Sequence, residues 1–549
     1  MAERATSQSA LAVALAYHER TKHRMTGYAA GPDTLDWDAQ PDPFRRYTGA
    51  PVTALPLQAD AVATTWADLF APGLIAPRAL DCNAMGVLFE LSFALSAWKH
   101  YGPDRWAVRV NPSSGNLHPT EAWLVCQGAE GIADGIHHYA PREHALEQRG
   151  TFSPPTDARK ATTRAFVVLT SIQWREAWKY GERAFRYCQL DVGHAIGALR
   201  YAAAVLGWRL RPVACSAEHV AALLGLDREA DFGSAEREEP DALFELLPQD
   251  AAAQDNGLGD WPVPTDWQGS PNRLDRHPMY RWPVIDAVAA ATRAQALPRG
   301  APGRSVQDLP DLARSSRSAA TLIRQRRSAQ RFDARARMPV ADLWRLLRAL
   351  HPVRLPFDAG PDQARVHVLL FAHRVDGLAP GVYLLPRSDA GRELFRRTLP
   401  AAPNLLPVPD APVDAPLLRL SENPALAGTL RTLNCHQALG SDAILGFALL
   451  AEFNPLPDAA AYRHRLQEAG LIGQVLYLEA EAMDLRGTGI GCFFDDALHQ
   501  LVGLPEPAAS APLQSVYHFT IGLPVTDARI ATEPPYAHLL PEREGPHHG

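Results

Sequence analysis

Residues 109–121 read Arg109-Val110-Asn111-Pro112-Ser113-Ser114-Gly115-Asn116-Leu117-His118-Pro119-Thr120-Glu121, and the apolar run Ala122-Trp123-Leu124-Val125-Cys126 follows directly. Prolines, glycine, asparagines and serines at this density do not continue a helix, so we expect a loop that enters a buried strand. We call residues 109–121 the Pro-Ser-Ser loop. Its small hydroxyl and amide side chains could hold a planar polar ligand through hydrogen bonds, and an ordinary polar connection is the alternative.

The segments on both sides of this loop predict a mixture of helices and strands. The apolar spacing from Met85 to Trp98 predicts a helix over residues 83–100 that leads to the loop. The other expected elements are a helix at 8–24, strands at 122–126, 134–139 and 164–171, a long helix from Tyr180 to Leu206 and a short helix at 218–226.

The composition is that of an ordinary globular protein with more than one domain. The chain has 549 residues, of which 46% are hydrophobic and 21% charged, and this length is too great for one hydrophobic core. A formal net charge of -7 gives neither a nucleic-acid footprint nor a basic membrane patch. We therefore expect no nucleic-acid partner and no membrane association.

The cysteines and the N-terminal segment indicate a cytoplasmic protein. The 6 cysteines include no C-x-x-C pair and no histidine-rich spacing, so we expect buried thiols in a reduced compartment and no metal site. The apolar residues 11–16 lack a basic segment and a small-residue cleavage site, and no run is long enough to span a bilayer.

The second half of the chain repeats three features of the first half in the same order. The pairs are 377–383 with 134–139, 462–470 with 185–193, and Leu501-Val502-Gly503-Leu504 with Leu223-Leu224-Gly225-Leu226. We interpret them as a duplicated domain, which would form an internal pseudo-dimer. The expected division is a first domain at 1–265, a linker at 266–314 and a second domain at 315–549.

Four segments together carry a resemblance to a known family. They are Asn111 to Pro119, Arg326-Arg327-Ser328-Ala329-Gln330-Arg331-Phe332, Glu468-Ala469-Gly470, and Gly487-Thr488-Gly489-Ile490-Gly491-Cys492-Phe493-Phe494-Asp495. On these segments the chain resembles the nitroreductase-like FMN flavoproteins, and within them the azoline dehydrogenases that oxidise peptide thiazolines and oxazolines. The resemblance covers roughly residues 10–265 and 315–535.

This resemblance implies an α+β fold class: two tandem nitroreductase-like α/β sandwiches, each an antiparallel-rich sheet covered by helices, in an intrachain pseudo-dimer. Family members are dimers with the flavin at the subunit interface. One partner holds the phosphate with arginines, which suit it because a guanidinium can bind a phosphate through two hydrogen bonds. The other partner places the Pro-Ser-Ser loop against the flavin ring.

The two halves of the chain are unequal in these features. The first half has the Pro-Ser-Ser loop but Thr21-Lys22-His23 at the phosphate position, and the second half has Arg326 to Ser328 but residues 354–360, without a serine pair, at the ring position. We therefore expect one complete FMN site between the halves. A twin site made of residues 21–23 and 354–360 should bind flavin weakly or not at all.

The resemblance also assigns individual residues. The cofactor-binding residues would be Arg109, Asn111, Pro112, Ser113, Ser114, Gly115, Asn116, Arg326, Arg327, Ser328, Gln330, Gly489, Ile490, Gly491 and Arg529. Solvated helix ends are the alternative for the arginines. Tyr187 or His194 could be a general acid or base. The alternative for these two is a buried hydrogen-bond network at the pseudo-dimer interface.

The function implied by the resemblance is that of an FMN-dependent oxidoreductase that transfers hydride at flavin N5, of the nitroreductase or azoline dehydrogenase type. The substrate would be a small molecule or a peptide, with NAD(P)H or oxygen as the electron partner. The alternative is a non-catalytic or degenerate flavin-binding scaffold subunit of a peptide-modifying biosynthetic complex. The glycines at 487–491 also resemble a dinucleotide-binding loop, but we reject this reading because they follow a predicted helix and not a strand.

Overall fold

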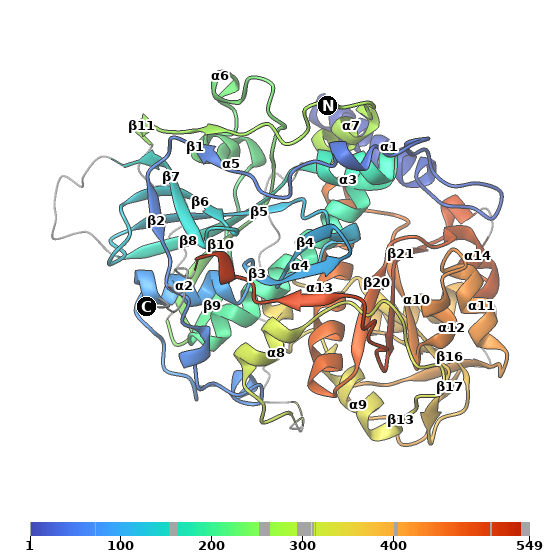
Figure 1. The fold of residues 1–549 in the computed structure, drawn as a ribbon. Coiled ribbons are helices and arrows are strands. Elements are labelled where there is room, and N and C mark those ends of the chain that lie inside the picture. The colour runs from blue at the N-terminus through green and yellow to red at the C-terminus, as the bar shows by residue number, and fades with distance from the viewer. Residues whose placement is uncertain are drawn as a thin grey trace.

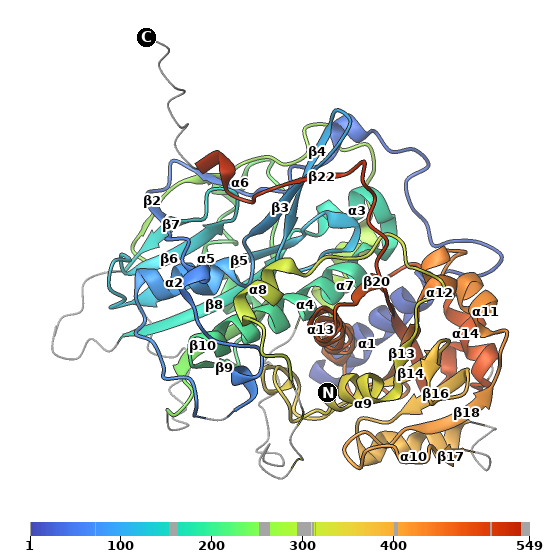
Figure 2. The ribbon, with the colours of Figure 1, turned by 60° about the horizontal axis from the view of Figure 1, so that its bottom comes forward.

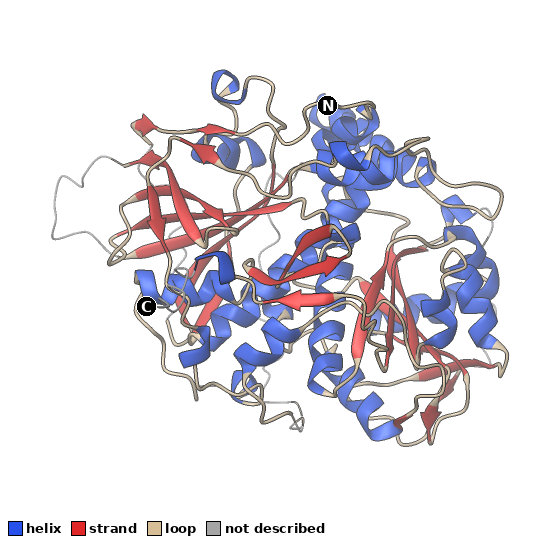
Figure 3. Cartoon of the chain, viewed as in Figure 1, coloured by secondary structure: helices blue, strands red, loops and turns tan. Residues whose placement is uncertain are grey.

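The chain forms two halves that lie side by side, as seen in a computed structural model (Figure 1). Each half has its own sheet, helices lie between the two sheets, and further helices cover the outer face of the sheet in the second half (Figure 3). The structure describes residues 2–71, 73–152, 163–251, 264–293, 309, 312, 314–399, 405–505 and 508–539. Residues 294–308 of the predicted linker lie outside this description.

The main sheet of the first half is antiparallel and has the order β11-β7-β6-β5-β8-β10-β9, with β2 on β7. Its central strands are buried on both faces, because β5 and β8 each contain a continuous apolar run, Ala122 to Cys126 and Ala165 to Leu169. The bounds are β2 Val52–Ala54, β5 Thr120–Gln127, β6 Gly135–Ala140, β7 Ala145–Thr151, β8 Arg164–Ser171, β9 Trp208–Pro212, β10 Glu239–Pro248 and β11 Asp266–Trp267.

The main sheet of the second half has the order β17-β18-β16-β14-β19-β21-β20, and its neighbours are also antiparallel. In chain order, the six strands β5 to β10 of the first sheet correspond to β14, β16, β18, β19, β20 and β21 of the second. Corresponding strands occupy the same places in the two sheets. The predicted α+β fold class is thus confirmed. The bounds are β14 Val366–Ala372, β16 Gly381–Leu385, β17 Leu406–Pro407, β18 Leu418–Glu422, β19 Leu445–Glu452, β20 Arg486–Ile490 and β21 Leu513–Gly522.

Two long buried helices, α4 (Ala184–Val205) and α13 (Ala460–Ala482), pack against each other at the centre of the molecule. They cross at glycines. A Cβ atom on Gly193 would lie 2.0 Å from the Gln467 carbonyl oxygen, and one on Gly470 would lie 2.0 Å from the Leu190 carbonyl oxygen. Because glycine has no side chain, the two helix backbones are in contact at this crossing. The close contact fixes the position of one half relative to the other.

The ends of the chain cross between the halves. The first helix, α1 (Ala2–Arg20), places His18 beside Tyr462 and Gln514 of the second half. In the opposite direction, β22 (Ala531–Glu533) pairs with β3 (Leu95–Tyr101), which pairs with β4 (Asp104–Arg109) (Figure 2). Each half is therefore completed by a segment of the other.

The remaining helices cover the sheets or connect them. They are α2 Cys82–Glu90, α3 Gln173–Tyr180, α5 Ala217–Leu224, α6 Glu229–Phe232, α7 Pro283–Ala291, α8 Ala319–Gln325, α9 Val340–Ala349, α10 Asp389–Thr398, α11 Leu426–Leu433, α12 Ala438–Asp442 and α14 Asp495–Val502. Short strand pairs join β1 (Tyr47–Thr48) with β12 (Ser270–Pro271) and β13 (Met338–Pro339) with β15 (Val375–Asp376).

The predicted helix over residues 83–100 is wrong in its second half. Helix α2 ends at Glu90, and β3 begins at Leu95. The apolar spacing was misleading because Leu95 to Trp98 are all buried within a strand that is covered on both faces, so they show no alternation. The Pro-Ser-Ser loop consequently follows strand β4 and not a helix.

Candidate functional site

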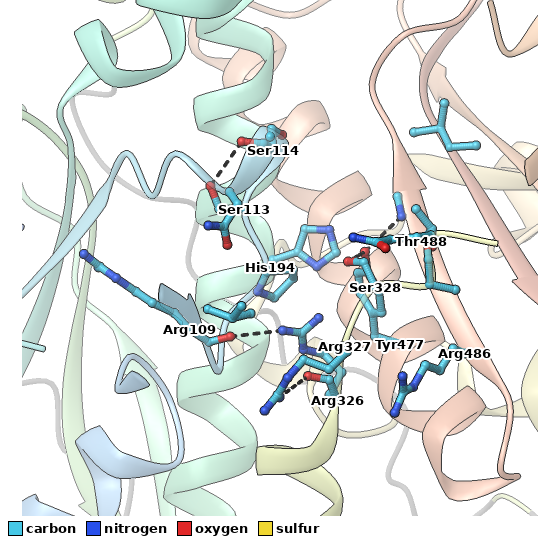
Figure 4. Close-up of a pocket in the computed structure, with 18 of the residues that line it drawn as sticks. Arg109, Ser113, Ser114, His194, Arg326, Arg327, Ser328, Tyr477, Arg486 and Thr488 are labelled. Atoms are coloured by element: carbon cyan, nitrogen blue, oxygen red, sulfur yellow. Dashed lines mark hydrogen bonds between the residues drawn. The ribbon is translucent and has the colours of Figure 1, made fainter. Parts of the chain in front are cut away.

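A cavity of about 460 Å³ lies between the two halves and is lined by residues of both. The Pro-Ser-Ser loop forms one side (Figure 4). The other side is formed by residues 326–330, which follow α8, by β20, and by the segment at 524–539, which we call the C-terminal arm. Of the predicted cofactor residues, those that line the cavity are Arg109, Asn111, Pro112, Ser113, Ser114, Gly115, Asn116, Arg326, Arg327, Ser328, Gln330, Gly489, Ile490 and Gly491. Both predicted acid or base candidates, Tyr187 and His194, line it as well.

Internal hydrogen bonds shape the Pro-Ser-Ser loop. Gly115, Asn116 and His118 all have φ between 54° and 60°, so the loop turns sharply through left-handed conformations. The Ser113 hydroxyl accepts a hydrogen bond from the His118 N–H at 2.8 Å, and the Asn116 amide donates to the Ala107 carbonyl at 2.8 Å. The Asn116 amide thus holds the loop.

Arg326 joins the halves at this loop. Its guanidinium donates to the carbonyl oxygens of Val110 and Arg109 at 3.0 and 3.1 Å. Arg109 in turn donates to Thr120 and Pro43 carbonyl oxygens and is 2% exposed. Because both guanidinium groups are engaged by backbone carbonyls, these two arginines position the loop across the cavity.

Arg327, Lys99 and Arg486 add positive charge to the cavity wall, and of these only Arg327 was predicted. Arg327 donates to the carbonyl oxygens of Arg324, Arg326 and Ser96, each at 2.7 Å, and Lys99 donates to the Thr532 hydroxyl at 2.6 Å. Burial, followed by repulsion from Arg326 and Arg486, lowers the pKa of Arg327 to about 9. Burial and repulsion from Arg327 and Arg486 also lower the pKa of Lys99. Within the described residues neither Arg327 nor Lys99 forms an ion pair, and the nearest carboxylate to Arg486 is Glu481 at 3.7 Å. Such a cluster favours an anionic ligand.

The cavity wall that contains β20 packs closely against tyrosine side chains. A Cβ atom on Gly489 would lie 1.8 Å from Tyr517 Oη, and one on Gly491 would lie 2.2 Å from the Tyr187 ring. The Tyr477 hydroxyl accepts a hydrogen bond from the Gly489 N–H at 3.0 Å and lies 2.8 Å from Ser328 Oγ. The glycines therefore allow backbone and aromatic rings to share the cavity wall.

The predicted acid or base candidates lie in a buried network. The ring of His194 contacts Tyr517 Oη at 3.0 Å and Gln474 Oε1 at 3.3 Å, and both partners belong to the second half. Burial lowers the pKa of His194 to about 3 and raises that of Tyr187 to about 12. Both groups are therefore uncharged near neutral pH. The contacts of His194 with two side chains of the second half favour a role in the interface network.

Other polar groups of the cavity were missed by the sequence reasoning. They include Lys99, Tyr180, Asp191, Tyr477, Arg486 and Tyr517. Lys99 lies in the segment that was expected to be helical, which hid its position. Arg486 is adjacent to Gly487, so its place beside the glycine segment was the one available signal.

Arg529 lies outside the cavity lining. Its side chain is 70% exposed and pairs with Asp527 at 2.6 Å and with the Tyr101 hydroxyl at 3.3 Å. Asp527 itself lines the cavity.

The segments of the predicted twin site do not meet. Residues 21–23 lie near Arg186, whose guanidinium donates to the Thr21 carbonyl at 3.3 Å, whereas Asp358 pairs with Arg200 at 2.8 Å. Arg186 and Arg200 are separated by 14 residues of α4, or about 21 Å. Lys22 is also neutralised by Asp496 and Glu19 at 2.9 and 3.0 Å, so no free charge is left there for a phosphate.

The described residues contain neither a membrane-spanning helix nor a cluster of metal ligands. None of their helices is both long and apolar enough to cross a membrane. Within the same residues, no group of three or more His, Cys, Asp or Glu side chains could hold a metal ion.

Comparison with known proteins finds similarity to nitroreductases. Residues 323–523 match the model of the nitroreductase family. A protein of Methanocaldococcus jannaschii named "putative nitroreductase" is 27% identical over 135 residues, which are 23% of this chain and 67% of that protein.

One solved structure shows a likeness in fold, and a second is similar over a smaller part of the chain. A "putative nitroreductase" from Anabaena variabilis has a TM-score of 0.66 with 21% identity and covers 93% of this chain and 99% of its own. Another from Ralstonia eutropha has a TM-score of 0.27 with 18% identity and covers 42% of this chain and 96% of its own. The first of these extends the fold likeness over nearly the whole chain.

Proposed function

We propose that the cavity between the halves binds one FMN and that the chain is an FMN-dependent oxidoreductase. The observation that carries this proposal is the cationic cluster of Lys99, Arg327 and Arg486, whose one ion pair within the described residues, Arg486 with Glu481, is long at 3.7 Å. The opposite side of the cavity is a hydroxyl- and amide-rich loop. A phosphate ester joined to a polar planar ring has the matching arrangement of charge. The nitroreductase family match over residues 323–523 supports the same cofactor.

Unsatisfied polar atoms also fit this group. Asn111 Oδ1 and both ring nitrogens of His118 are buried and have no hydrogen-bond partner in the described part of the chain. Both residues line the cavity. Buried polar atoms are seldom left unpaired, so a bound ligand with its own donors and acceptors would satisfy them.

The residues divide into three roles. Arg327, Arg486 and Lys99 would hold the phosphate, and the Pro-Ser-Ser loop with the Gly489 to Gly491 backbone would enclose the ring. Bound FMN would supply hydride transfer at its N5. Tyr187 and Tyr517 close the wall beside the glycines and keep water from that side of the cavity.

The reaction proposed is oxidation or reduction of a small molecule or a peptide, of the nitroreductase or azoline dehydrogenase type, with NAD(P)H as one candidate electron donor. The two halves would be fused domains, so a single chain would act as the pseudo-dimer. The α4 and α13 crossing and the exchanged ends support this arrangement, because each half supplies part of the cavity wall.

Absorbance and cofactor stoichiometry of the purified protein test the proposal. We expect a yellow protein with one FMN per chain, which NADPH or NADH bleaches under anaerobic conditions. Two FMN per chain would contradict the single site, and failure of added FMN to bind would contradict the cofactor assignment. FMN that binds but is not reduced and supports no oxidase activity would favour the alternative of a non-catalytic subunit.

A further inference from the structure

Two buried carboxyl groups lie directly behind the Pro-Ser-Ser loop. Asp191, on α4, is 2% exposed and lines the cavity. Its carboxylate accepts hydrogen bonds from the Ser114 N–H and from the Ser114 hydroxyl, each at 3.0 Å. The cavity is therefore connected to Asp191 through the side chain of Ser114.

The second carboxyl group belongs to Glu176 on α3. Its residue is 0% exposed, and neither carboxyl oxygen has a hydrogen bond of ordinary geometry in the described part of the chain, although the Ser113 hydroxyl lies close enough to lower its pKa. Leaving a buried carboxylate unpaired costs several kcal/mol, roughly, so such a group takes up a proton instead. An unpaired acid at this depth is unusual in a structure whose other buried carboxylates, such as Asp495 and Asp241, are paired with arginines.

Both groups are poised to carry a proton near neutral pH. Burial raises the pKa of Asp191 to about 7, and the hydrogen bonds from Ser114 and Ser113 limit the rise. Burial also raises the pKa of Glu176, the charge of Asp191 raises it further, and Lys179 and the Ser113 hydroxyl lower it. Ser113 thus lies close enough to influence both acids.

The surroundings add no strong compensating charge. The titratable groups that face the pair are Lys179 and Tyr180 on α3, Cys188 on α4 and Tyr517 on β21. Burial lowers the pKa of Lys179, and burial raises the pKa of Tyr180, Cys188 and Tyr517. The phenols and the thiol are thus uncharged at neutral pH, which leaves Asp191, with a pKa of about 7, as the group of this set that titrates there.

We propose that Glu176 and Asp191 form a buried proton relay that ends at the Ser113 and Ser114 hydroxyls and exchanges protons with the molecule bound in the cavity. The proton of the Asp191 carboxyl group passes to Ser114 Oγ while the proton of that hydroxyl passes to an acceptor in the cavity. Glu176 then returns a proton to Asp191 through Ser113. These steps move protons only, and no electron is transferred. The inference rests on the proposed function, because a redox reaction in the cavity would need a source of protons.

Infrared spectroscopy of the ligand-free protein tests whether the relay exists. Between pH 6 and pH 8 we expect the protonated-carboxyl band to weaken with a midpoint near the pKa of Asp191, about 7. Asp191→Asn should remove this titration, and Ser114→Ala should move its midpoint upward because the hydroxyl stabilises the ionised form. Asp286→Asn, on the exposed face of α7, is the matched control and should leave the band unchanged. An unchanged band in Asp191→Asn would contradict the proposal.

Calorimetric titration with FMN and with riboflavin tests the link to the cavity. The heat of binding is measured at pH 7 in two buffers of different ionisation enthalpy, and the difference gives the number of protons that the protein exchanges with the buffer when flavin binds. For wild-type protein we expect a few tenths of a proton per flavin. In Glu176→Gln and in Asp191→Asn this number should fall by at least half. Riboflavin lacks the phosphate of FMN, whose second pKa is about 6. Proton exchange on riboflavin binding therefore cannot come from titration of the phosphate. Equal proton exchange in wild type and variants, with flavin still bound, would overturn the relay alone. No binding of either flavin by wild type would overturn the proposed function and the relay with it.

If Asp191→Asn fails to fold, Glu176→Gln and Ser114→Ala decide the matter. Glu176 makes no hydrogen bond that its replacement would break in the described structure. Loss of proton exchange in Glu176→Gln with an unchanged flavin dissociation constant supports the relay. Retention of proton exchange in both Glu176→Gln and Ser114→Ala contradicts it.

Discussion

The charged side chains of the cavity differ in what they bind, although they look alike in the sequence. Arg326, Arg109 and Arg327 all donate to backbone carbonyls. Lys99 donates instead to the Thr532 hydroxyl, and the nearest carboxylate to Arg486 is Glu481 at 3.7 Å. Burial and repulsion within the cluster lower the pKa of Arg327 and Lys99, so an anionic ligand would be favoured beside them. The distinction depends on the three-dimensional neighbours of each side chain.

Replacing Arg327 or Arg486 by glutamine tests the phosphate assignment. We expect the FMN dissociation constant to rise about 10- to 100-fold, because a charge-assisted hydrogen bond to phosphate contributes about 1.5–3 kcal/mol. Riboflavin binding, measured by the same fluorescence titration, should change little. Arg529→Gln is the control, since its side chain is 70% exposed and already paired with Asp527. A loss of FMN affinity in Arg529→Gln equal to that in Arg486→Gln would contradict the assignment.

A buried histidine controls stability in alkaline solution. His138 lies between Glu121 and Glu147 at 3.0 and 2.9 Å. Burial lowers the pKa of His138, but the hydrogen bonds to both glutamates outweigh burial and raise it to about 9. Because the folded pKa exceeds the unfolded value of 6.5, the stabilisation is full below pH 6.5 and is lost as the pH rises through 9.

Urea unfolding between pH 6 and pH 9.5 measures this effect. The free energy of unfolding should fall by about 3 kcal/mol over the window, at 1.36 kcal/mol per pKa unit. His138→Gln should remove most of the slope and leave the smaller part that comes from Asp191, whose pKa is about 7. A control substitution at His100, whose side chain is 27% exposed, should keep the whole slope. A flat pH profile in wild type would show that His138 is not charged in the folded protein.

At the scale of elements, the crossing of α4 and α13 determines whether the cavity exists. Both helices lie between the sheets, α4 presents Tyr187, Asp191 and His194 to the cavity, and α13 presents Tyr477. The contact depends on Gly193 and Gly470, which stand at corresponding positions of the repeated segments 185–193 and 462–470. A change in helix spacing would therefore displace both walls of the cavity.

Gly193→Ala tests the crossing. The new methyl group would meet the Gln467 carbonyl oxygen at 2.0 Å, so the helices must separate, and we expect a loss of about 3 kcal/mol or more of stability together with FMN binding. Gly428→Ala, on α11, is the matched control, because no atom lies within 4 Å of its Cβ position. It should gain about 0.5–1 kcal/mol from helix propensity. Equal melting temperatures of the two variants would contradict this account.

At the scale of the whole molecule, the exchanged ends join the halves more firmly than a linker does. The C-terminal arm provides Asp527, Ile530 and Thr532 to the cavity and then pairs with β3. The Tyr536 hydroxyl accepts from the Leu95 N–H at 3.0 Å and donates to the Pro141 carbonyl at 2.8 Å. Flavin binding and the attachment of the arm should therefore be coupled.

Tyr536→Ala tests this coupling. Removing a buried aromatic side chain should cost about 3–5 kcal/mol, release the arm and weaken FMN binding at least tenfold. The measurements are thermal unfolding and FMN titration of the same preparation. Leu539→Ala, in the same arm but 44% exposed, should change neither quantity. Loss of stability without loss of FMN affinity would show that the arm is not part of the site.

The sequence by itself determined the fold class, the repeated order of elements and the segments that meet at the cavity. Strands with continuous apolar runs, the turn residues of the Pro-Ser-Ser loop and the arginines after α8 all depend on neighbours along the chain, so a local reading predicts them. Only the tertiary structure decided that β3 is a strand, that Arg326 holds the loop while Lys99 and Arg486 join Arg327 in the cavity wall, and that residues 21–23 and 354–360 lie apart. Burial, pairing and raised pKa values, as at Asp191 and Glu176, arise from side chains far apart in sequence. For this reason the sequence predicted which segments line the cavity, and the packing of the two halves decided how the charged groups of the cavity are buried and paired.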